Sequence, residues 1–275
     1  MSLVVRNLSC GYGDIEVLSD LNVDFSTDQI LTILGPNGIG KTTLFKTILG
    51  FLKPKAGFIE IDGKKTSALS HRELAKLLAY VPQKQVVPFA YPVEEFILMG
   101  RAPHLGLLQQ PGSGDREIVH QVMRLLEIEH IASKSCTSIS GGELQLVFVA
   151  RALTQQPRYL IMDEPTANLD YGNQTKVLEC ILDLAQSGIG VIMTTHNPEH
   201  AFILESQVVL LQSNRKYLCG SYNEILTESC LHDTYDIEVI IRTLNHQGRD
   251  LITCRTVPNC FCKPERRKRT TEQHG

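Results

Sequence analysis

The sequence has no apolar run that approaches the roughly 20 residues a helix needs to cross a bilayer. Its first residues, MSLVVRNLSC, lack the charged start and the long apolar core of a signal peptide. We therefore expect the protein to stay in the cytoplasm and to work at a membrane only if a partner holds it there.

A strong charge of either sign is also missing. The 27 lysines and arginines nearly balance the 30 acidic residues, which leaves a net charge of −3. This balance argues against a mainly nucleic-acid-binding surface, so we expect no nucleic acid as a partner.

The eight cysteines are scattered, and only Cys260 and Cys262 lie close together. A lone C-x-C lacks the paired spacing of a zinc site, which favours idle or buried thiols.

Apolar residues make up 43% of the chain and charged residues 21%, as in a soluble globular protein. Residues 3–25 mix short apolar runs with the turn CGYGD, which predicts a small antiparallel sheet. Strand-like segments then alternate with helical ones, a pattern typical of a parallel sheet covered by helices. From about residue 88 to 155 the pattern is helical, and we interpret this stretch as an inserted helical subdomain.

The segment GPNGIGKT, Gly35–Thr42, matches the phosphate-loop pattern G-x-x-x-x-G-K-[ST] between an apolar strand and a helix. Its glycines allow a backbone whose N–H groups point at a phosphate. Lys41 supplies a positive charge, and the Thr42 hydroxyl can ligate Mg²⁺. The alternative is a glycine-rich turn that binds nothing, but the strand and helix on either side favour ATP. The predicted nucleotide contacts are Gly35, Pro36, Asn37, Gly38, Ile39, Gly40, Lys41, Thr42 and Thr43.

Two carboxylates follow the apolar strand in YLIMDEP. Such a strand would place Asp163 and Glu164 at the sheet edge that also carries the phosphate loop. Asp163 suits a water-mediated Mg²⁺ ligand, and Glu164 suits a general base for the attacking water. An ordinary acidic turn before Pro165 is the alternative, and the nearby phosphate loop disfavours it.

Two further strands end in polar residues. In VIMTTH, His196 could hydrogen-bond the γ-phosphate, although a structural histidine is the alternative. In AYVPQ, Gln83 could bind near Mg²⁺ and accept from the attacking water, but this signal is weak by itself.

The segment SISGGEL provides a second candidate phosphate cradle, in which Ser140, Gly141 and Gly142 begin a helix. One active site does not need two cradles from one chain. A symmetric dimer does, because each chain can offer its second cradle to the nucleotide of its partner.

These motifs, in this order, resemble those of the ATP-binding cassette (ABC) ATPases over about residues 2–240. The resemblance implies a P-loop NTPase with a parallel-sheet α/β core, an N-terminal antiparallel β subdomain and an inserted α-helical subdomain. It also implies a head-to-tail dimer, with each ATP between residues 35–43 of one chain and Ser140–Glu143 of the other. Within the family, Tyr12 resembles the aromatic that stacks on adenine, and Asp170 resembles the loop that contacts the opposite subunit.

Four segments are most similar to importer ATPases for metal chelates, namely ferric siderophores, haem, cobalamin and molybdate. These segments are LAYVPQ, FAYPVEEFILMGRAPHLG, ARALTQQP and THNPEHA. That resemblance implies a subunit on the cytoplasmic face of the membrane, held by permease subunits and served indirectly by an extracytoplasmic substrate-binding protein. Residues 83–108 would receive a permease helix. We expect Phe96, Ile97 and Leu98 to be core, and the following apolar side chains to be exposed there: Phe89, Tyr91, Leu105, Leu107 and Leu108.

Residues 241–275 would form a C-terminal extension that loses regular structure from about Gly248 and ends in the basic segment KPERRKRTTEQHG. Two other functions stay open at this point. A soluble ABC protein of ribosome control or DNA repair usually has two cassettes or a long coiled coil, and this chain has neither. A simple P-loop kinase would have no use for SISGGEL.

Overall fold

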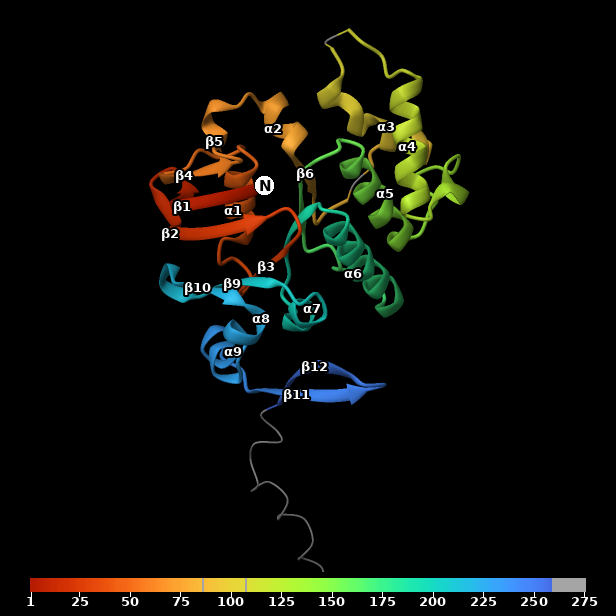
Figure 1. The fold of residues 1–275 in the computed structure, drawn as a ribbon. Coiled ribbons are helices and arrows are strands. Elements are labelled where there is room, and N and C mark those ends of the chain that lie inside the picture. The colour runs from red at the N-terminus through yellow and green to blue at the C-terminus, as the bar shows by residue number, and fades with distance from the viewer. Residues whose placement is uncertain (86, 107, 259–275) are drawn as a thin grey trace, which may run out of the picture.

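Five parallel strands form the centre of the fold, and a sixth pairs antiparallel at one edge. The computed structural model describes residues 1–85, 87–106 and 108–258. Its largest sheet has the order β10-β9-β3-β8-β7-β6, and Figure 1 shows its strands between the helices. The bounds are β3 (Ile30–Leu34), β6 (Leu78–Val81), β7 (Tyr159–Asp163), β8 (Gly190–Thr194), β9 (Gln207–Leu211) and β10 (Tyr217–Ser221).

The sequences of the central strands explain their position. Every residue of β3, β7 and β8 is buried, and these strands are rich in Ile, Leu, Val and Met. Strands of a parallel sheet are covered on both faces, so they read as continuous apolar runs without alternation. The prediction of a parallel-sheet core is therefore confirmed.

A second sheet, antiparallel and of order β2-β1-β4-β5, is built mostly from the start of the chain, as predicted. Helix α1 packs its Leu44 and Phe45 into a core shared by this sheet and the parallel one. The elements are β1 (Ser2–Tyr12), β2 (Ile15–Ser26), α1 (Lys41–Ile48), β4 (Ala56–Ile61), β5 (Lys64–Lys65), η1 (Thr66–Ala68) and α2 (His71–Leu77).

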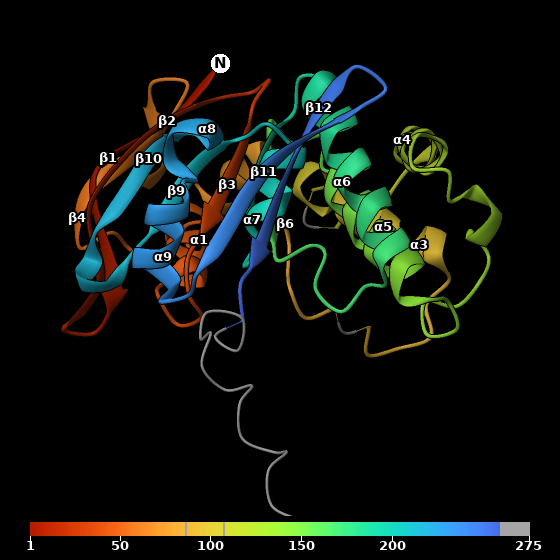
Figure 2. The same ribbon diagram turned by 90° about the horizontal axis from the view of Figure 1, so that it is seen from below.

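All named elements among the described residues between β6 and β7 are helices, as expected for the predicted helical insertion. Figure 2 shows these helices as a separate group on one side of the sheets. Phe96 and Phe148 meet at 5.1 Å between ring centroids, and Ile97 and Leu98 are buried, as predicted for core residues. The elements are α3 (Val93–Leu98), η2 (Met99–His104), α4 (Ser113–Leu125), η3 (Glu129–Ile131) and α5 (Gly141–Leu153).

The chain returns to the sheet and ends in a small helical and hairpin region. The remaining elements are α6 (Tyr171–Gln186), α7 (Pro198–Ile203), η4 (Ser213–Arg215), α8 (Tyr222–Ile225), α9 (Glu228–Tyr235), β11 (Val239–His246) and β12 (Arg249–Thr256). In the described part of the chain, no helix is both long enough and apolar enough to cross a membrane.

The expected loss of regular structure from about Gly248 is wrong for Arg249–Thr256, which forms β12. Gln247 and Gly248 both have positive φ, 52° and 79°, the conformation of a two-residue hairpin turn that twists with its strands. The Thr253 hydroxyl also donates to Glu199 of α7 at 2.8 Å, which ties the hairpin to the body. The basic tail, Cys260 and Cys262 lie outside the described residues.

His200 makes the stability of this fold depend on pH. Its side chain is 5% exposed, and Asn197 Nδ2 lies 3.4 Å from Nε2 while Nδ1 lies 2.9 Å from the Thr195 hydroxyl. Burial, and then the nearby His196, lower the pKa of His200 to about 4, although Glu199 opposes the shift. The unfolded histidine takes up a proton near its ordinary value, whereas the buried one does not.

We therefore expect the free energy of unfolding to fall as the pH drops from about 6.5 to about 4. The contribution of this one histidine is on the order of 3 kcal/mol. Urea unfolding at a series of pH values should show a shallower decline for His200→Gln than for the unaltered protein. Equal slopes for the two proteins would contradict the assignment.

Candidate functional site

Residues that follow four neighbouring strands meet at one edge of the parallel sheet. The loop 35–40 leaves β3, and Gln83 follows β6. Asp163 is the last residue of β7, Glu164 follows it, and His196 follows β8. A hollow of about 400 Å³ lies at this edge. Its lining residues are Asn37, Gly38, Gly40, Lys41, Thr42, Thr43, Gln83, Asp163 and Glu164, all of them singled out from the sequence.

The loop before α1 has the backbone that its glycines predict. Gly40 is the N-cap of α1 with φ 119°, and a Cβ there would lie 2.6 Å from Val17 Cγ1. Only glycine fits this position, because both the conformation and the space exclude a side chain. The α1 helix therefore begins with free N–H groups beside the hollow, a geometry suited to a phosphate.

Lys41 is 7% exposed, and its ammonium group donates to the carbonyl oxygens of Gly35 at 2.6 Å and Pro36 at 3.2 Å. Burial lowers its pKa, while the negative charges of Glu164 and Asp163 act in the opposite direction. A buried ammonium that donates to neutral carbonyl oxygens is well placed to bind a polyanion that enters the hollow.

The two carboxylates differ in their surroundings. Asp163 is 5% exposed, and its Oδ2 accepts from the Thr42 hydroxyl at 3.3 Å. Glu164 Oε2 accepts from Gln83 Nε2 at 2.7 Å and lies 3.7 Å from His196 Nδ1. Glu164 therefore touches both side chains that the sequence associated with the attacking water.

Oxygen atoms near Asp163 also fit the chemistry of Mg²⁺. This ion prefers oxygen ligands and is held through one or two carboxylates together with substrate phosphates. The Thr42 hydroxyl and the Asp163 carboxylate converge at the hollow, which Gln83 also lines. These residues could hold Mg²⁺ beside a bound triphosphate.

Two residues of the site were missed from the sequence. The Thr194 hydroxyl donates to Asp163 Oδ1 at 2.6 Å, and the Tyr80 hydroxyl lies 3.5 Å from Oδ2. Burial, and then Asp163, raise the pKa of Tyr80 to about 12. In the sequence, Thr194 and Tyr80 look like ordinary strand residues. The one sign that they belong to the site is that each lies in a strand that leads into a predicted site residue.

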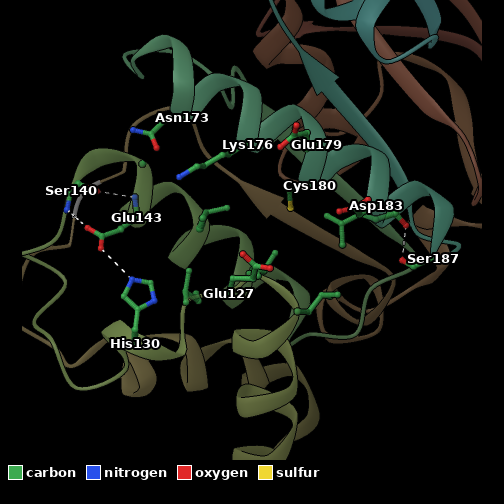
Figure 3. A pocket seen from close by; sticks show the side chains of 16 residues that line it. Glu127, His130, Ser140, Glu143, Asn173, Lys176, Glu179, Cys180, Asp183 and Ser187 are labelled. Atoms are coloured by element: carbon green, nitrogen blue, oxygen red, sulfur yellow. Dashed lines mark hydrogen bonds and ion pairs between the residues drawn. The ribbon is translucent and has the colours of Figure 1, made fainter. Parts of the chain in front are cut away.

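The second predicted cradle lies elsewhere in the chain. Ser140 and Glu143 line a hollow of about 660 Å³ between α5 and α6, which Figure 3 shows. Ser140 caps α5 by accepting from the Glu143 N–H at 3.2 Å, and Glu143 accepts from the Ser140 N–H at 2.7 Å. Neither residue lines the hollow of the phosphate loop, so one chain keeps its two cradles apart.

Gly142 connects this cradle with Asp170. A Cβ on Gly142 would lie 2.5 Å from Cγ of Asn173, so the two residues are in close contact. Asn173 in turn donates its backbone N–H to Asp170 Oδ1 at 2.9 Å and its side-chain amide to Oδ2 at 2.7 Å. By contrast, a Cβ on Gly141 would meet nothing within 4 Å.

Tyr12 stands apart from the other predicted contacts. Its ring is 46% exposed, its hydroxyl lies 3.4 Å from Lys46 Nζ, and this nitrogen is 5.8 Å from the ring centroid. Tyr12 does not line the hollow of the phosphate loop.

Comparison with known proteins agrees with this geometry. Residues 18–167 match the family model described as ABC transporter. An uncharacterized ABC transporter ATP-binding protein of Haemophilus influenzae is 40% identical over 86% of this chain and 89% of its own length. The hemin import ATP-binding protein HmuV of Pseudomonas entomophila is 34% identical over 92% of this chain and 100% of its own length.

The fold also matches a solved structure, described as an inward-facing ABC transporter of metal-chelate type. The TM-score is 0.85 at 30% identity, and the match covers 94% of this chain and 99% of the other. The family match includes the phosphate loop, the second cradle and the Asp163–Glu164 pair. The chain therefore belongs to the ABC transporter family, as an ATP-binding ATPase subunit.

Proposed function

We propose that this protein hydrolyses ATP with Mg²⁺ to power the import of a metal chelate: a ferric siderophore, haem, cobalamin or molybdate. The convergence of Lys41, Thr42, Asp163 and Glu164 at one hollow is the observation that carries the proposal. Similarity to a hemin import protein and to a transporter of metal-chelate type supports this substrate class.

Within one chain, the phosphates would bind the N–H groups at the start of α1 and the ammonium of Lys41. Thr42 and Asp163, with Gln83, would hold Mg²⁺, which neutralises phosphate charge when bound. Glu164 would take the proton of the attacking water, since its carboxylate lies at the hollow and is 2.7 Å from the Gln83 amide. His196, 3.7 Å from Glu164, would hydrogen-bond the γ-phosphate and the water.

A second copy of the chain would complete each site. The separation of the two hollows supports this proposal, because Ser140, Gly141, Gly142 and Glu143 cannot enclose a phosphate that their own chain binds. In a head-to-tail dimer they would close over the nucleotide of the partner. Tyr12 would stack on the adenine, and the loop of Asp170 would contact the opposite subunit.

The permease would dock on the helical insertion. A small hollow of about 320 Å³ lies there, and Tyr91, Leu98, Met99 and Leu105 are among its lining residues. Two residues near these in the sequence are exposed, as predicted: Phe89 to 65% and Leu108 to 95%. Tyr91 and Leu105, which were also expected to be exposed, are partly buried. Leu107 lies outside the described residues. Exposed apolar groups around a hollow favour a protein interface, here with a cytoplasmic helix of the permease.

We also propose that residues 2–240 form the ATPase domain, with its helical subdomain at about 88–155, and that residues 241–275 are an extension. The subunit would lie on the cytoplasmic face of the membrane and meet the extracytoplasmic binding protein only through the permease. The import function of HmuV favours this role over a soluble one in ribosome control or DNA repair.

Replacing Glu164 by Gln should lower ATP turnover by at least about a hundredfold, because the amide cannot accept the proton of the attacking water. Turnover should be measured on the protein purified with its permease, and ATP binding should persist. Undiminished turnover would remove Glu164 as the base.

Replacing Gly141 by Asp should leave ATP binding by the single chain intact, because the new side chain meets open space within its own chain. We expect Glu164→Gln, which should bind ATP without hydrolysing it, to form an ATP-dependent dimer. Adding Gly141→Asp to this variant should abolish the dimer, since the added carboxylate would face the phosphates of the partner's nucleotide. Light scattering with and without ATP measures the dimer. Lys41→Ala is the matched comparison and should weaken ATP binding itself. Loss of ATP binding in Gly141→Asp would contradict the two-chain site.

Cells that lack this protein should lose uptake of one metal chelate and regain it with the unaltered chain but not with Glu164→Gln. Uptake of labelled ferric siderophore, haem, cobalamin and molybdate, with identification of the co-purifying permease, tests the substrate class. Recovery of ribosomes or DNA, with no membrane protein, would favour the soluble alternative.

A further inference from the structure

Thr194, the last residue of β8, binds both residues of the carboxylate pair with a single hydroxyl group. Its side chain is fully buried. The hydroxyl donates to Asp163 Oδ1 at 2.6 Å and accepts from the backbone N–H of Glu164 at 2.9 Å. The hydroxyl proton of Thr194 therefore points to Asp163, because the Glu164 N–H is itself a donor and cannot accept that proton.

The bond to the Glu164 N–H holds an unusual backbone. Glu164 has φ 47°, the left-handed region that residues with a Cβ rarely adopt. Such a conformation persists only where neighbouring groups fix it. In it, the Glu164 carboxylate reaches the amide of Gln83 and the ring of His196.

The bond to Asp163 assigns different tasks to its two carboxylate oxygens. Oδ1 is taken by Thr194, and Oδ2 faces the hydroxyls of Thr42 at 3.3 Å and Tyr80 at 3.5 Å. Thr194 does not line the hollow. By bonding Oδ1 it leaves Oδ2 as the oxygen that faces the phosphate loop.

We propose that Thr194 is a positioning residue for this ATPase site, which orients Oδ2 of Asp163 toward the phosphate loop and fixes the backbone of Glu164. The inference rests on the proposed function. It adds one hydroxyl that controls the metal-facing oxygen and the catalytic base together. A group of this kind behind a metal ligand typically affects metal affinity or activity by about 10- to 100-fold.

Thr194→Val tests the proposal, because it removes the hydroxyl and keeps the branched shape. Thr194→Ser retains the hydroxyl and should rescue the activity. Thr32→Val is the matched control, because Thr32 is fully buried in β3 of the same sheet. Its hydroxyl bonds that of Ser206 at 2.7 Å, outside the site. Both valine variants lose a buried hydroxyl, and Thr194→Val should lose more thermal stability, because its hydroxyl makes two hydrogen bonds, one of them to a carboxylate.

We expect Thr194→Val to lower kcat for ATP at least about tenfold while KM for ATP changes little, since Lys41 and the loop still bind the phosphates. The half-saturating Mg²⁺ concentration should rise by a similar factor. Binding of Mn²⁺ to the complex with a non-hydrolysable ATP analogue, followed by electron paramagnetic resonance, should weaken equally. Thr32→Val should match the unaltered protein in all three measurements.

Equal kinetics and equal Mn²⁺ affinity in Thr194→Val and Thr32→Val would overturn the inference, as would failure of Thr194→Ser to rescue. If the unaltered protein with its permease hydrolyses no ATP, the proposed function fails instead, and the Mn²⁺ measurement still tests how Asp163 is held. If Thr194→Val does not fold, Thr194→Cys against Thr32→Cys makes the same comparison, because a thiol is only a weak donor.

Discussion

The parallel pairing of β3, β8, β7 and β6 is the constraint on which the site depends. Parallel strands end at the same edge, so the residues that follow them must meet there, however far apart they lie in sequence. Thr42 and Asp163 are 121 positions apart and lie in hydrogen-bond contact. The buried apolar strands thus stabilise the fold and set the spacing of the site at the same time.

Polar side chains are buried together at this edge, and hydrogen bonds between them restrict their conformations. Lys41 donates to two carbonyl oxygens, and Asp163 accepts from the hydroxyls of Thr42 and Thr194. Burying such charges is costly unless hydrogen bonds compensate, and Thr194 and Thr42 supply these bonds to Asp163. Hydrogen bonds within the chain hold these side chains, and side chains held in this way lose little conformational freedom on binding.

The chain carries two separate hollows, each lined by one of its candidate phosphate cradles. Asn173 lies in close contact with Gly142 of the second cradle and donates two hydrogen bonds to Asp170. A movement of the second cradle would therefore displace the loop of Asp170. The hairpin of β11 and β12 lines neither hollow, and the hydrogen bond from Thr253 to Glu199 connects it to α7.

The sequence by itself determined the strands β3, β6, β7 and β8, the phosphate loop and the helix that begins at Ser140, because these depend on local apolar runs, glycine conformations and a capping box within four residues. It did not predict the strand Arg249–Thr256, whose pairing with β11 depends on a turn and whose Thr253 contacts α7. Only the tertiary structure decided that Thr194 and Tyr80 bind Asp163 and that Asn173 packs on Gly142. These contacts join residues whose neighbours in sequence give no sign of the partner, and only the packing of the strands and helices brings them within hydrogen-bond distance.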